Sequence, residues 1–322
     1  MDKDKNDKVE NENNGNIMLS IVCHTYNHEN YIGETIDGFL NQKTNFPFEI
    51  IIHDDASTDK TPLIIKEYQE KYPELIKVIY QTDNKYSKGI NIWTNYTFPK
   101  CQGKYIALCE GDDYWTDENK LQKQVVFLEN NPNYVVTWTD YLNFNGTDFK
   151  ENHFGFSQEM ITIDYNNIFN PYCTYSLTTV FLKSALDMDL LNSLKEFKDN
   201  SIYMLLLKNG NGAFMNFCSA VYRIHEGGVY SLKSLYFQRY SSYLNLKELY
   251  DLIPESHSKN IKNTLETLKR SASFEALKIK YTSDLIDEEQ TNLIKSYFSK
   301  ASLPILLKYY KRIFQYKFLN KI

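Results

Sequence analysis

Glycine and proline are scarce in this chain, with only 12 Gly and 8 Pro among 322 residues. This scarcity excludes collagen-like and Gly/Pro-rich low-complexity proteins. No run approaches the 18 or so apolar residues that a membrane-spanning helix needs, and the first residues lack the apolar segment of a secretory signal. We therefore expect neither a spanning helix nor a signal peptide.

Cysteine is also sparse, and none of the five cysteines forms a CxxC pair. A zinc site is therefore not expected, and we predict buried free thiols in a reducing cytoplasm. The charge is nearly balanced, because 36 Lys and Arg face 41 Asp and Glu, giving a net charge of −5. This balance excludes a basic coat for nucleic acid. Aromatic residues, in contrast, are abundant, with 26 Tyr and 19 Phe.

Short apolar runs alternate with segments of helical spacing through the first two thirds of the chain. Residues 1–16 are almost entirely polar and are predicted to be a disordered leader. Strands are predicted at residues 17–23, 48–53, 76–80, 105–109, 135–144, 178–182 and 213–224. Helices are predicted at residues 31–42, from Pro62 onward, at 91–100, through 121–128, at 199–207 and from about 235 to the end.

This alternation indicates an α/β fold with a mostly parallel central sheet and helices on both of its faces. Such sheets bind ligands beyond the carboxyl ends of their strands. Polar residues at those ends are therefore candidates for function.

Three predicted strands end in polar or acidic clusters: Thr25-Tyr26-Asn27, the block from Asp54 to Asp59, and Glu110-Gly111-Asp112-Asp113. A single Asp after a strand is commonly a turn former or helix cap. Two adjacent-Asp pairs at one sheet edge would instead repel each other unless a cation or a ligand lay between them. Carboxylates without His or Cys companions suit Mg²⁺ or Mn²⁺, and Mg²⁺ usually combines one or two carboxylates with substrate phosphates.

The order and spacing of these clusters resemble the family 2 glycosyltransferases of GT-A (Rossmann-like) fold. The resemblance rests on Leu19-Ser20-Ile21-Val22 before the first cluster, HDDASTD over 53–59, Asn95 before GKYIALCEGDD over 103–113, and YRIHEGG over 222–228. It covers about residues 17–232. It implies an inverting transferase of the bacterial surface-polysaccharide type.

The resemblance also implies roles for individual residues. Asp199 matches the general base of the family, and Asp112, Asp113 and His225 match its metal-binding positions, for Mn²⁺ or Mg²⁺. The nucleotide-sugar donor would be bound by Thr25, Tyr26, Asn27, Asp54, Asp55, Asp112 and His225, with Asp55 or Asp54 bonding the base, typically uracil. Asp199 could alternatively be only a helix N-cap.

Two further features bear on the acceptor side. Trp115 follows the acidic turn directly, which makes it our candidate for stacking on an acceptor sugar, although a core position is the alternative. Residues 290–322 hold seven basic residues and no acidic one, and large apolar residues recur among them at helical spacing. A basic amphipathic helix of this kind is typical of a membrane-surface element. Packing on the chain itself or in a homodimer through the C-terminal helices is the other interpretation.

We therefore predict a metal-dependent glycosyltransferase that moves a sugar from a nucleotide diphosphate, typically UDP, to a glycan or lipid-linked hydroxyl. The predicted organisation is a leader (1–16), a catalytic domain (17–232) and a helical C-terminal extension (233–322). Within the catalytic domain, 17–115 would bind the nucleotide sugar and 116–232 the acceptor. We expect a cytoplasmic protein that can lie on the inner face of the membrane.

A nucleotidyltransferase and a non-catalytic nucleotide-sugar-binding module are the alternative functions. A nucleotidyltransferase would be expected to carry a Gly-rich basic phosphate loop near residues 24–30, which this chain lacks.

Overall fold

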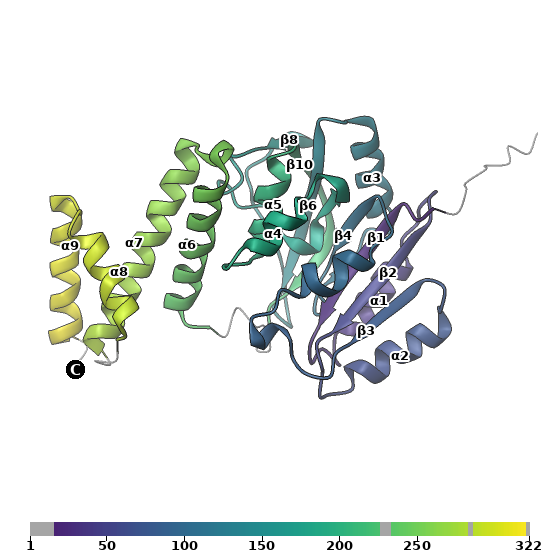
Figure 1. Cartoon of the computed structure of the whole chain (residues 1–322), viewed down its shortest axis with the longest axis horizontal. Coiled ribbons are helices and arrows are strands. Elements are labelled where there is room, and N and C mark those ends of the chain that lie inside the picture. Colours follow the sequence, from purple (N-terminus) through teal and green to yellow (C-terminus); the bar gives the residue numbers. More distant parts are fainter. Residues whose placement is uncertain (1–15, 226–232, 283–285, 320–322) are drawn as a thin grey trace, which may run out of the picture. The chain divides into compact units, whose positions relative to one another are not determined.

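The computed structural model describes residues 16–225, 233–282 and 286–319 (Figure 1). By its internal contacts the chain divides into two units. Unit 1 consists of the chain up to Pro132 together with Ser176–Ser184 and Ser219–Val221. Unit 2 consists of Asn133–Tyr175, Ala185–Cys218 and the chain from Tyr222 onward. Most of the predicted leader, residues 1–15, lies outside the described residues.

The apolar runs of unit 1 form a parallel sheet. Its strands, in the order β3-β2-β1-β4, are β3 (Ile76–Tyr80), β2 (Phe48–Asp54), β1 (Leu19–Thr25) and β4 (Tyr105–Leu108). All seven residues of β1 are buried, as expected for a strand covered on both faces. β9 (Val180–Leu182) continues this sheet antiparallel to β4, and β5 (Tyr114–Trp115) pairs antiparallel with Ala220 and Val221.

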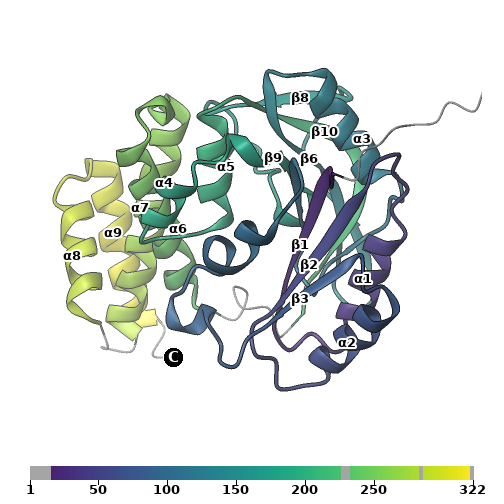
Figure 2. The ribbon, with the colours of Figure 1, turned by 45° about the vertical axis from the view of Figure 1, so that its right-hand side comes forward.

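The helices of unit 1 begin and end close to the predicted positions. They are α1 (Ile32–Leu40), α2 (Thr61–Lys71) and α3 (Lys120–Asn130), and α1 and α2 pack against each other beside the sheet (Figure 2). Short 3₁₀ turns lie at Tyr86–Lys88, Ser176–Thr178 and Lys183–Ala185. At α2 the cap position is Lys60, and the carboxylate of Asp59 accepts a hydrogen bond from the Thr61 N–H at 2.9 Å.

The helix predicted at 91–100 is not a regular α-helix. A π turn at Trp93–Thr97 leads directly into a 3₁₀ turn at Phe98–Lys100. Pro99 explains the difference, because proline has no N–H and its ring clashes with the preceding helical turn.

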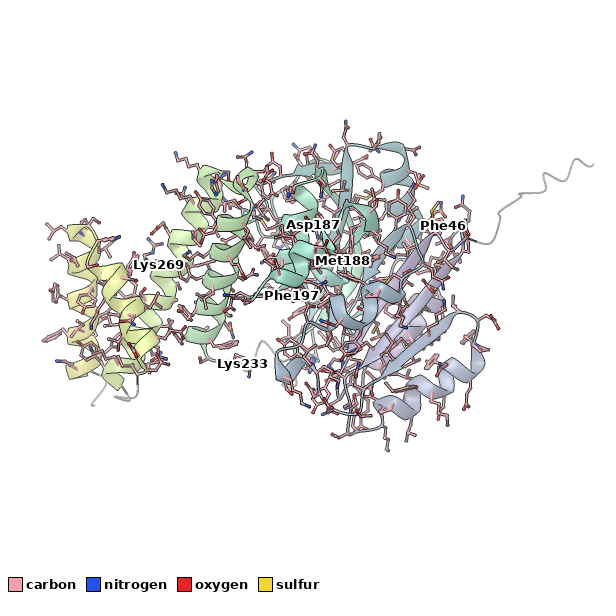
Figure 3. The ribbon with its side chains drawn as sticks, in the orientation of Figure 1. Phe46, Asp187, Met188, Phe197, Lys233 and Lys269 are labelled. Carbon is pink, nitrogen blue, oxygen red and sulfur yellow. The ribbon has the colours of Figure 1, made fainter. Side chains whose placement is uncertain are left out.

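Unit 2 contains antiparallel strands and two helices that precede its last strand. The strands are β6 (Tyr134–Phe144), β7 (Phe149–Glu151), β8 (Met160–Ile163) and β10 (Asn211–Arg223), of which Ser219–Val221 is counted with unit 1. The helices are α4 (Met188–Ser193) and α5 (Asp199–Leu207). β7 pairs with β6 and β8 with β10. Asp187, labelled in Figure 3, caps α4, since its Oδ1 accepts a hydrogen bond from the Leu190 N–H at 2.9 Å. The buried ring of Trp138 packs edge-on against Tyr203 at 5.3 Å.

From residue 235 onward the described chain is helical, as predicted. The elements are α6 (Leu235–Leu252), a 3₁₀ turn at Pro254–Ser256, α7 (Lys259–Thr282), α8 (Glu288–Phe298), α9 (Leu303–Phe314) and a π turn at Gln315–Leu319. A separate core holds the last three helices together; it contains Phe274, Ala276, Leu277, Ile294 and Phe298.

Two expectations from composition can be compared with this structure. Among the described residues, no helix combines the length and apolarity needed to cross a membrane. The five cysteines all lie among the described residues and form no disulfide; four are buried as predicted, whereas Cys218 is exposed. The α/β class with a C-terminal helical extension is confirmed.

Candidate functional site

The loop after β1 is tied to the loop after β2. Asn27 has a φ of +56°, in the left-handed region that Asn tolerates better than most residues. Its N–H donates to Ser57 Oγ at 2.8 Å, and its Oδ1 accepts a hydrogen bond from the Thr58 N–H at 2.7 Å. The preceding Tyr26 is 37% exposed. The polar residues predicted at two separate strand ends therefore form one connected structure.

The two aspartates after β2 have different environments. Asp54 is buried and lies opposite Thr25 in the parallel register, and its Oδ1 accepts a hydrogen bond from Ser57 Oγ at 2.5 Å. Burial raises the pKa of the Asp54 carboxyl, although the hydrogen bonds from Ser57 oppose this effect. Asp55 accepts hydrogen bonds from the backbone N–H groups of Lys85 and Tyr86, at 2.8 and 2.9 Å. Asp55 therefore holds the loop that follows β3.

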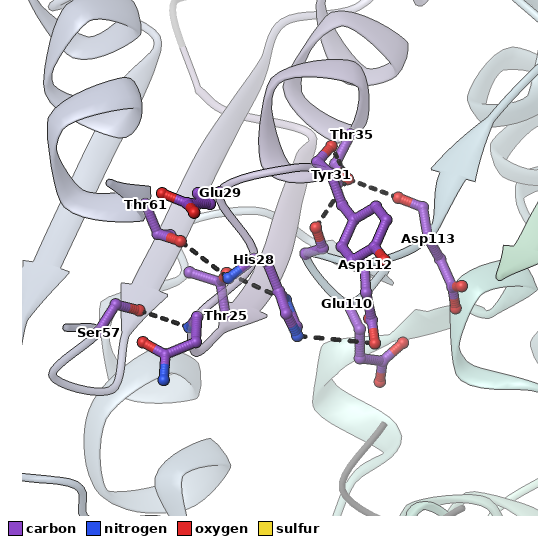
Figure 4. Close-up of polar contacts among 12 residues, drawn as sticks. Thr25, His28, Glu29, Tyr31, Thr35, Ser57, Thr61, Glu110, Asp112 and Asp113 are labelled. Atoms are coloured by element: carbon purple, nitrogen blue, oxygen red, sulfur yellow. Dashed lines mark hydrogen bonds and ion pairs between the residues drawn. The ribbon is translucent and has the colours of Figure 1, made fainter. Parts of the chain in front are cut away.

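The acidic turn after β4 contacts the end of β1 through a histidine (Figure 4). His28 Nδ1 lies 3.2 Å from Thr25 Oγ1, and His28 Nε2 lies 3.7 Å from Asp112 Oδ2. On the other side of the turn, Glu110 Oε2 accepts a hydrogen bond from Ser176 Oγ at 2.7 Å. The charges of this turn also reach Cys23 in β1, where burial first and these carboxylates second raise the pKa of the thiol.

A threonine from α1 fixes the backbone of the same turn. Thr35 Oγ1 lies 3.0 Å from the carbonyl oxygen of Gly111 and 2.6 Å from that of Asp113, and it is fully buried (Figure 4). At Gly111, a Cβ atom would lie 2.6 Å from Thr25 Oγ1 and 3.1 Å from His28 Nδ1. Only glycine fits this close approach of the two loops. The sequence interpretation missed both Thr35 and the reason for Gly111, although a glycine inside an acidic turn was a usable signal for the latter.

The structure places Trp115 in the core of unit 1. Its ring is 4% exposed, Phe39 packs edge-on against it at 4.7 Å, and its indole N–H donates to the Leu177 carbonyl at 2.7 Å. The ammonium nitrogen of Lys120 lies 4.3 Å from the ring centroid. The core alternative for Trp115 is therefore the observed one, and its ring is not presented for stacking on a sugar.

Lys120 itself is a second feature that the sequence interpretation missed. It is fully buried at the start of α3, and its Nζ donates to Gln124 Oε1 at 2.8 Å. Burial lowers the pKa of this amine to about 7. The core beneath the acidic turn thus contains a titratable amine.

The remaining candidates, Asp199 and His225, belong to unit 2. Lys198 occupies the N-cap position of α5 and Asp199 its first turn, so Asp199 is not the N-cap. Burial raises the pKa of the Asp199 carboxyl, and the neighbouring Lys198 opposes this shift. His225 is half-buried just after β10, while Glu226, Gly227 and Gly228 of the same motif lie outside the described residues.

The acidic turn can contribute to a metal site but does not form one by itself. Within residues 16–225, 233–282 and 286–319, no three His, Cys, Asp or Glu side chains form a group that could hold a metal ion. This donor set fits a cation such as Mg²⁺ or Mn²⁺, which takes one or two carboxylates from the protein and completes its shell with phosphates and water. Asp112 and Asp113 are two such carboxylates.

Sequence comparisons relate this chain to one uncharacterized protein and to named glycosyltransferases. An uncharacterized protein of Mycobacterium tuberculosis is 49% identical over 120 residues, covering 37% of this chain and a third (33%) of that relative's own length. The putative teichuronic acid biosynthesis glycosyltransferase TuaG of Bacillus subtilis is 29% identical over 67% of this chain and 82% of its own. The Escherichia coli UDP-Glc:alpha-D-GlcNAc-diphosphoundecaprenol beta-1,3-glucosyltransferase WfaP is 29% identical over 66% of this chain and 79% of its own.

Solved structures confirm the GT-A-type fold. TarS 1–349 of S. aureus in complex with UDP-GlcNAc gives a TM-score of 0.58 at 20% identity, covering 93% of this chain and 81% of that one. The mannosyltransferase PcManGT of Pyrobaculum calidifontis, in complex with GDP-Man and Mn²⁺, gives 0.53 at 13% identity, covering 93% and 84%. The sequence model of glycosyl transferase family 2 matches residues 20–185, more than half of the chain. The chain therefore belongs to glycosyl transferase family 2.

Proposed function

We propose that this protein is an inverting glycosyltransferase that moves a sugar from a UDP-linked donor to a hydroxyl of a glycan or a lipid-linked acceptor. The observation that carries the proposal is the junction of three loops at one edge of the unit 1 sheet, where Thr25, Asp54 and Asp112 meet inside the region matched by the family. The name of TuaG (teichuronic acid biosynthesis) supports a glycan product, and that of WfaP supports a UDP-linked donor and a lipid-linked acceptor. The complex of TarS with UDP-GlcNAc is consistent with UDP as the nucleotide.

For the donor, we assign the nucleotide to Thr25, Tyr26 and Asn27 and its base to Asp54. Asp54 is preferred over Asp55 because two backbone N–H groups already engage the Asp55 carboxylate. Asp112 would bind a part of the nucleotide-sugar donor other than its base. This part of the assignment falls within residues 17–115, the predicted donor half, and the acceptor is assigned to 116–232.

For the metal, we assign the carboxylates of Asp113 and Asp112 in unit 1 as the residues that would hold Mn²⁺ or Mg²⁺, and we keep His225, which belongs to unit 2, as the third candidate that the family resemblance implies. Such a cation, when bound, offsets negative charge on the diphosphate of the donor. The choice between the two cations is left open by the donor set, because both prefer oxygen ligands.

For the transfer step, Asp199 would accept the proton of the acceptor hydroxyl as its oxygen attacks the anomeric carbon. The bond from that carbon to the diphosphate oxygen breaks on the opposite face, so the configuration inverts. The raised pKa of Asp199 favours this role, because a base works best when its pKa approaches the working pH. We place the protein in the cytoplasm, peripheral to the inner face of the membrane.

The experiment is a thermal-shift screen of the full chain with UDP, UDP-glucose, UDP-GlcNAc and GDP-mannose, each with and without Mn²⁺. A ligand at about 100 times its Kd stabilises the folded state by about 2.7 kcal/mol, which raises the Tm by several degrees. We expect a Mn²⁺-dependent rise with UDP compounds that is lost in Asp113→Ala and kept in Glu74→Ala, an exposed carboxylate of the same unit. No metal-dependent shift with any nucleotide would contradict the proposal.

A further inference from the structure

Helix α9, whose place in the chain is seen in Figure 1, has large apolar side chains on two of its faces. The first packs inward against the core of α7 and α8; it consists of Ile305, Leu306, Tyr309 and Ile313. This stripe explains how α9 is held in unit 2. It does not account for the other large apolar side chains of the helix.

The second stripe faces solvent. Leu303, Leu307, Tyr310 and Phe314 are 69, 62, 64 and 58% exposed, and we call these four residues the outer stripe. Their spacing of four, three and four residues places them on one face of the helix. Single exposed apolar residues are ordinary, but an aligned row of four large ones on one helix face is typical of an interaction surface.

Unpaired cations border the outer stripe. Lys311 lies four residues after Leu307, beside the outer stripe, and Lys308 lies about 100° round the helix from Leu307, on the same side as Lys311; both are exposed. Lys300, in the turn before α9, is exposed as well. Among the described residues, none of these three lysines forms an ion pair, and residues 290–322 contain no acidic residue that could supply one.

We propose that the outer stripe docks on an anionic lipid surface. An interfacial helix of this kind buries its apolar face about 5–10 Å deep, at the boundary of headgroups and acyl chains, while the flanking lysines contact lipid phosphates. The docking chemistry requires only α9 and is independent of the proposed transfer reaction. If that reaction also holds, docking brings the enzyme to the surface where a lipid-linked acceptor resides.

Charge favours a bilayer over a second copy of the chain. A two-fold interface brings the same surface of both copies together, so Lys308 and Lys311 of each copy would lie close to those of the other. Like charges opposed without acidic partners destabilise such a contact. An anionic bilayer instead supplies the missing negative charge.

The test is sedimentation of the full chain with phosphatidylcholine vesicles, alone or with 30 mol% phosphatidylglycerol (about a third anionic lipid, in the range that attracts basic segments). We expect the protein to pellet with the anionic vesicles and to be released by about 1 M salt, which shortens the Debye length to about 3 Å. Replacing Lys308 and Lys311 by Gln should weaken partitioning by about 30-fold, since each lysine near such a surface contributes about 1 kcal/mol and 1.36 kcal/mol is tenfold. The matched control replaces Lys66 and Lys71 of α2, which are also exposed, by Gln.

The apolar contribution is tested with Leu307→Gln combined with Phe314→Gln. Its control is Leu63→Gln combined with Phe149→Gln, whose side chains are 62 and 57% exposed, closely matching the test pair. We expect a loss of vesicle binding of more than about tenfold for the first pair and little change for the second. All four positions are exposed, so the Tm of each variant should stay near that of the natural chain.

Three outcomes would overturn the proposal: no pelleting of the natural chain with anionic vesicles at low salt, unchanged pelleting of the Leu307/Phe314 variant, or a natural chain that is dimeric without lipid while this variant is monomeric. The last result would make the outer stripe a protein interface. The nucleotide thermal shift serves as an independent readout, because it should be the same in all these variants. Its absence would count against the proposed function and not against lipid docking.

Discussion

Lys120 shows how a single residue can give the fold a pH dependence. Its amine is buried against Trp115 and Gln124, and burial lowers its pKa from the ordinary value to about 7. In the unfolded chain the same amine keeps its proton up to about pH 10. Between these values the unfolded state binds more protons, so the free energy of unfolding contributed by this group rises with pH.

We predict that Lys120→Met removes this dependence. Between pH 7 and pH 9 the natural chain should gain about 2 kcal/mol in its free energy of unfolding relative to Lys120→Met, from a shift of this size. Urea unfolding at pH 6.5, 8 and 9 measures the difference. Lys123→Met, at an exposed position of the same helix that pairs with Asp117, should keep the slope of the natural chain. If the free energy of unfolding changed with pH in the same way for the natural chain and for Lys120→Met, the prediction would be wrong, because the buried amine would then keep its proton over this range.

The same residue shows why part of the site was not predictable. The spacing of Leu121, Val125 and Leu128 predicts the helix, and these residues form the buried apolar face of α3. Lys120 and Gln124 are also buried on that face, where they are four residues apart and form a hydrogen bond with each other. A pattern of hydrophobic residues cannot predict the burial of two polar ones. Trp115 was misplaced for a related reason: its polar surroundings in sequence suggested a surface, while Leu177, 62 residues later, supplies the partner for its indole N–H.

At the scale of elements, Glu49 connects the strands of unit 1 near their amino ends. It is 1% exposed and accepts hydrogen bonds from Ser20 Oγ at 2.7 Å, the Gln102 N–H at 2.7 Å and Lys77 Nζ at 2.6 Å. Burial alone would raise the pKa of Glu49, but these hydrogen bonds outweigh it and hold the pKa below its ordinary value. One carboxylate therefore joins β1, β3 and the segment before β4 to β2.

We predict that Glu49→Gln lowers the free energy of unfolding by about 2–4 kcal/mol at pH 7, because buried donors lose their charged acceptor. The carboxylate's contribution is fully present above its unfolded pKa of about 4.3 and is lost as the pH falls through the lower folded value. The difference between the natural chain and the variant should therefore shrink at low pH. Urea unfolding at pH 7 and below pH 4 tests this, with Glu70→Gln on the exposed face of α2 as the control. If the natural chain and Glu49→Gln were equally stable at pH 7, the Glu49 carboxylate would not stabilise the fold as proposed.

Elements with a clear apolar run were predicted well, whereas three short strands were not predicted. The strand at residues 76–80 has the predicted bounds, as does the helix at 199–207, because each is a mainly apolar segment that its own sequence marks out. β5, β7 and β8 have two to four residues and depend on partners elsewhere in the chain. In the candidate site, the loop after β1 was located from the sequence. Its contact with the acidic turn through the side chain of His28 was not, because that contact depends on the tertiary structure.

At the scale of the whole molecule, the candidate residues are divided between the units. Those assigned to the nucleotide and its base lie in unit 1, whereas Asp199 opens α5 in unit 2. Negative charge in the first turn of a helix is stabilised by the helix dipole, so Asp199 is compatible with a stable α5 even though its carboxylate is desolvated. Because different residues are proposed for donor binding and for proton transfer, we predict that the two can be lost independently.

The corresponding variant is Asp199→Asn, which keeps the size of the side chain and removes the base. We expect the rate of sugar transfer to fall by about 10²–10⁴-fold, the usual contribution of a positioned general base, while the Mn²⁺-dependent thermal shift with the nucleotide sugar stays unchanged. Asp189→Asn is the matched control, since Asp189 is an exposed carboxylate in the first turn of α4 in the same unit. Transfer at the natural rate in Asp199→Asn would assign the proton to another group, and a lost thermal shift would mean that Asp199 supports donor binding instead. Only a reduced rate with an intact shift places the proton-accepting step at Asp199, because only that combination separates the chemistry of transfer from the binding of its donor.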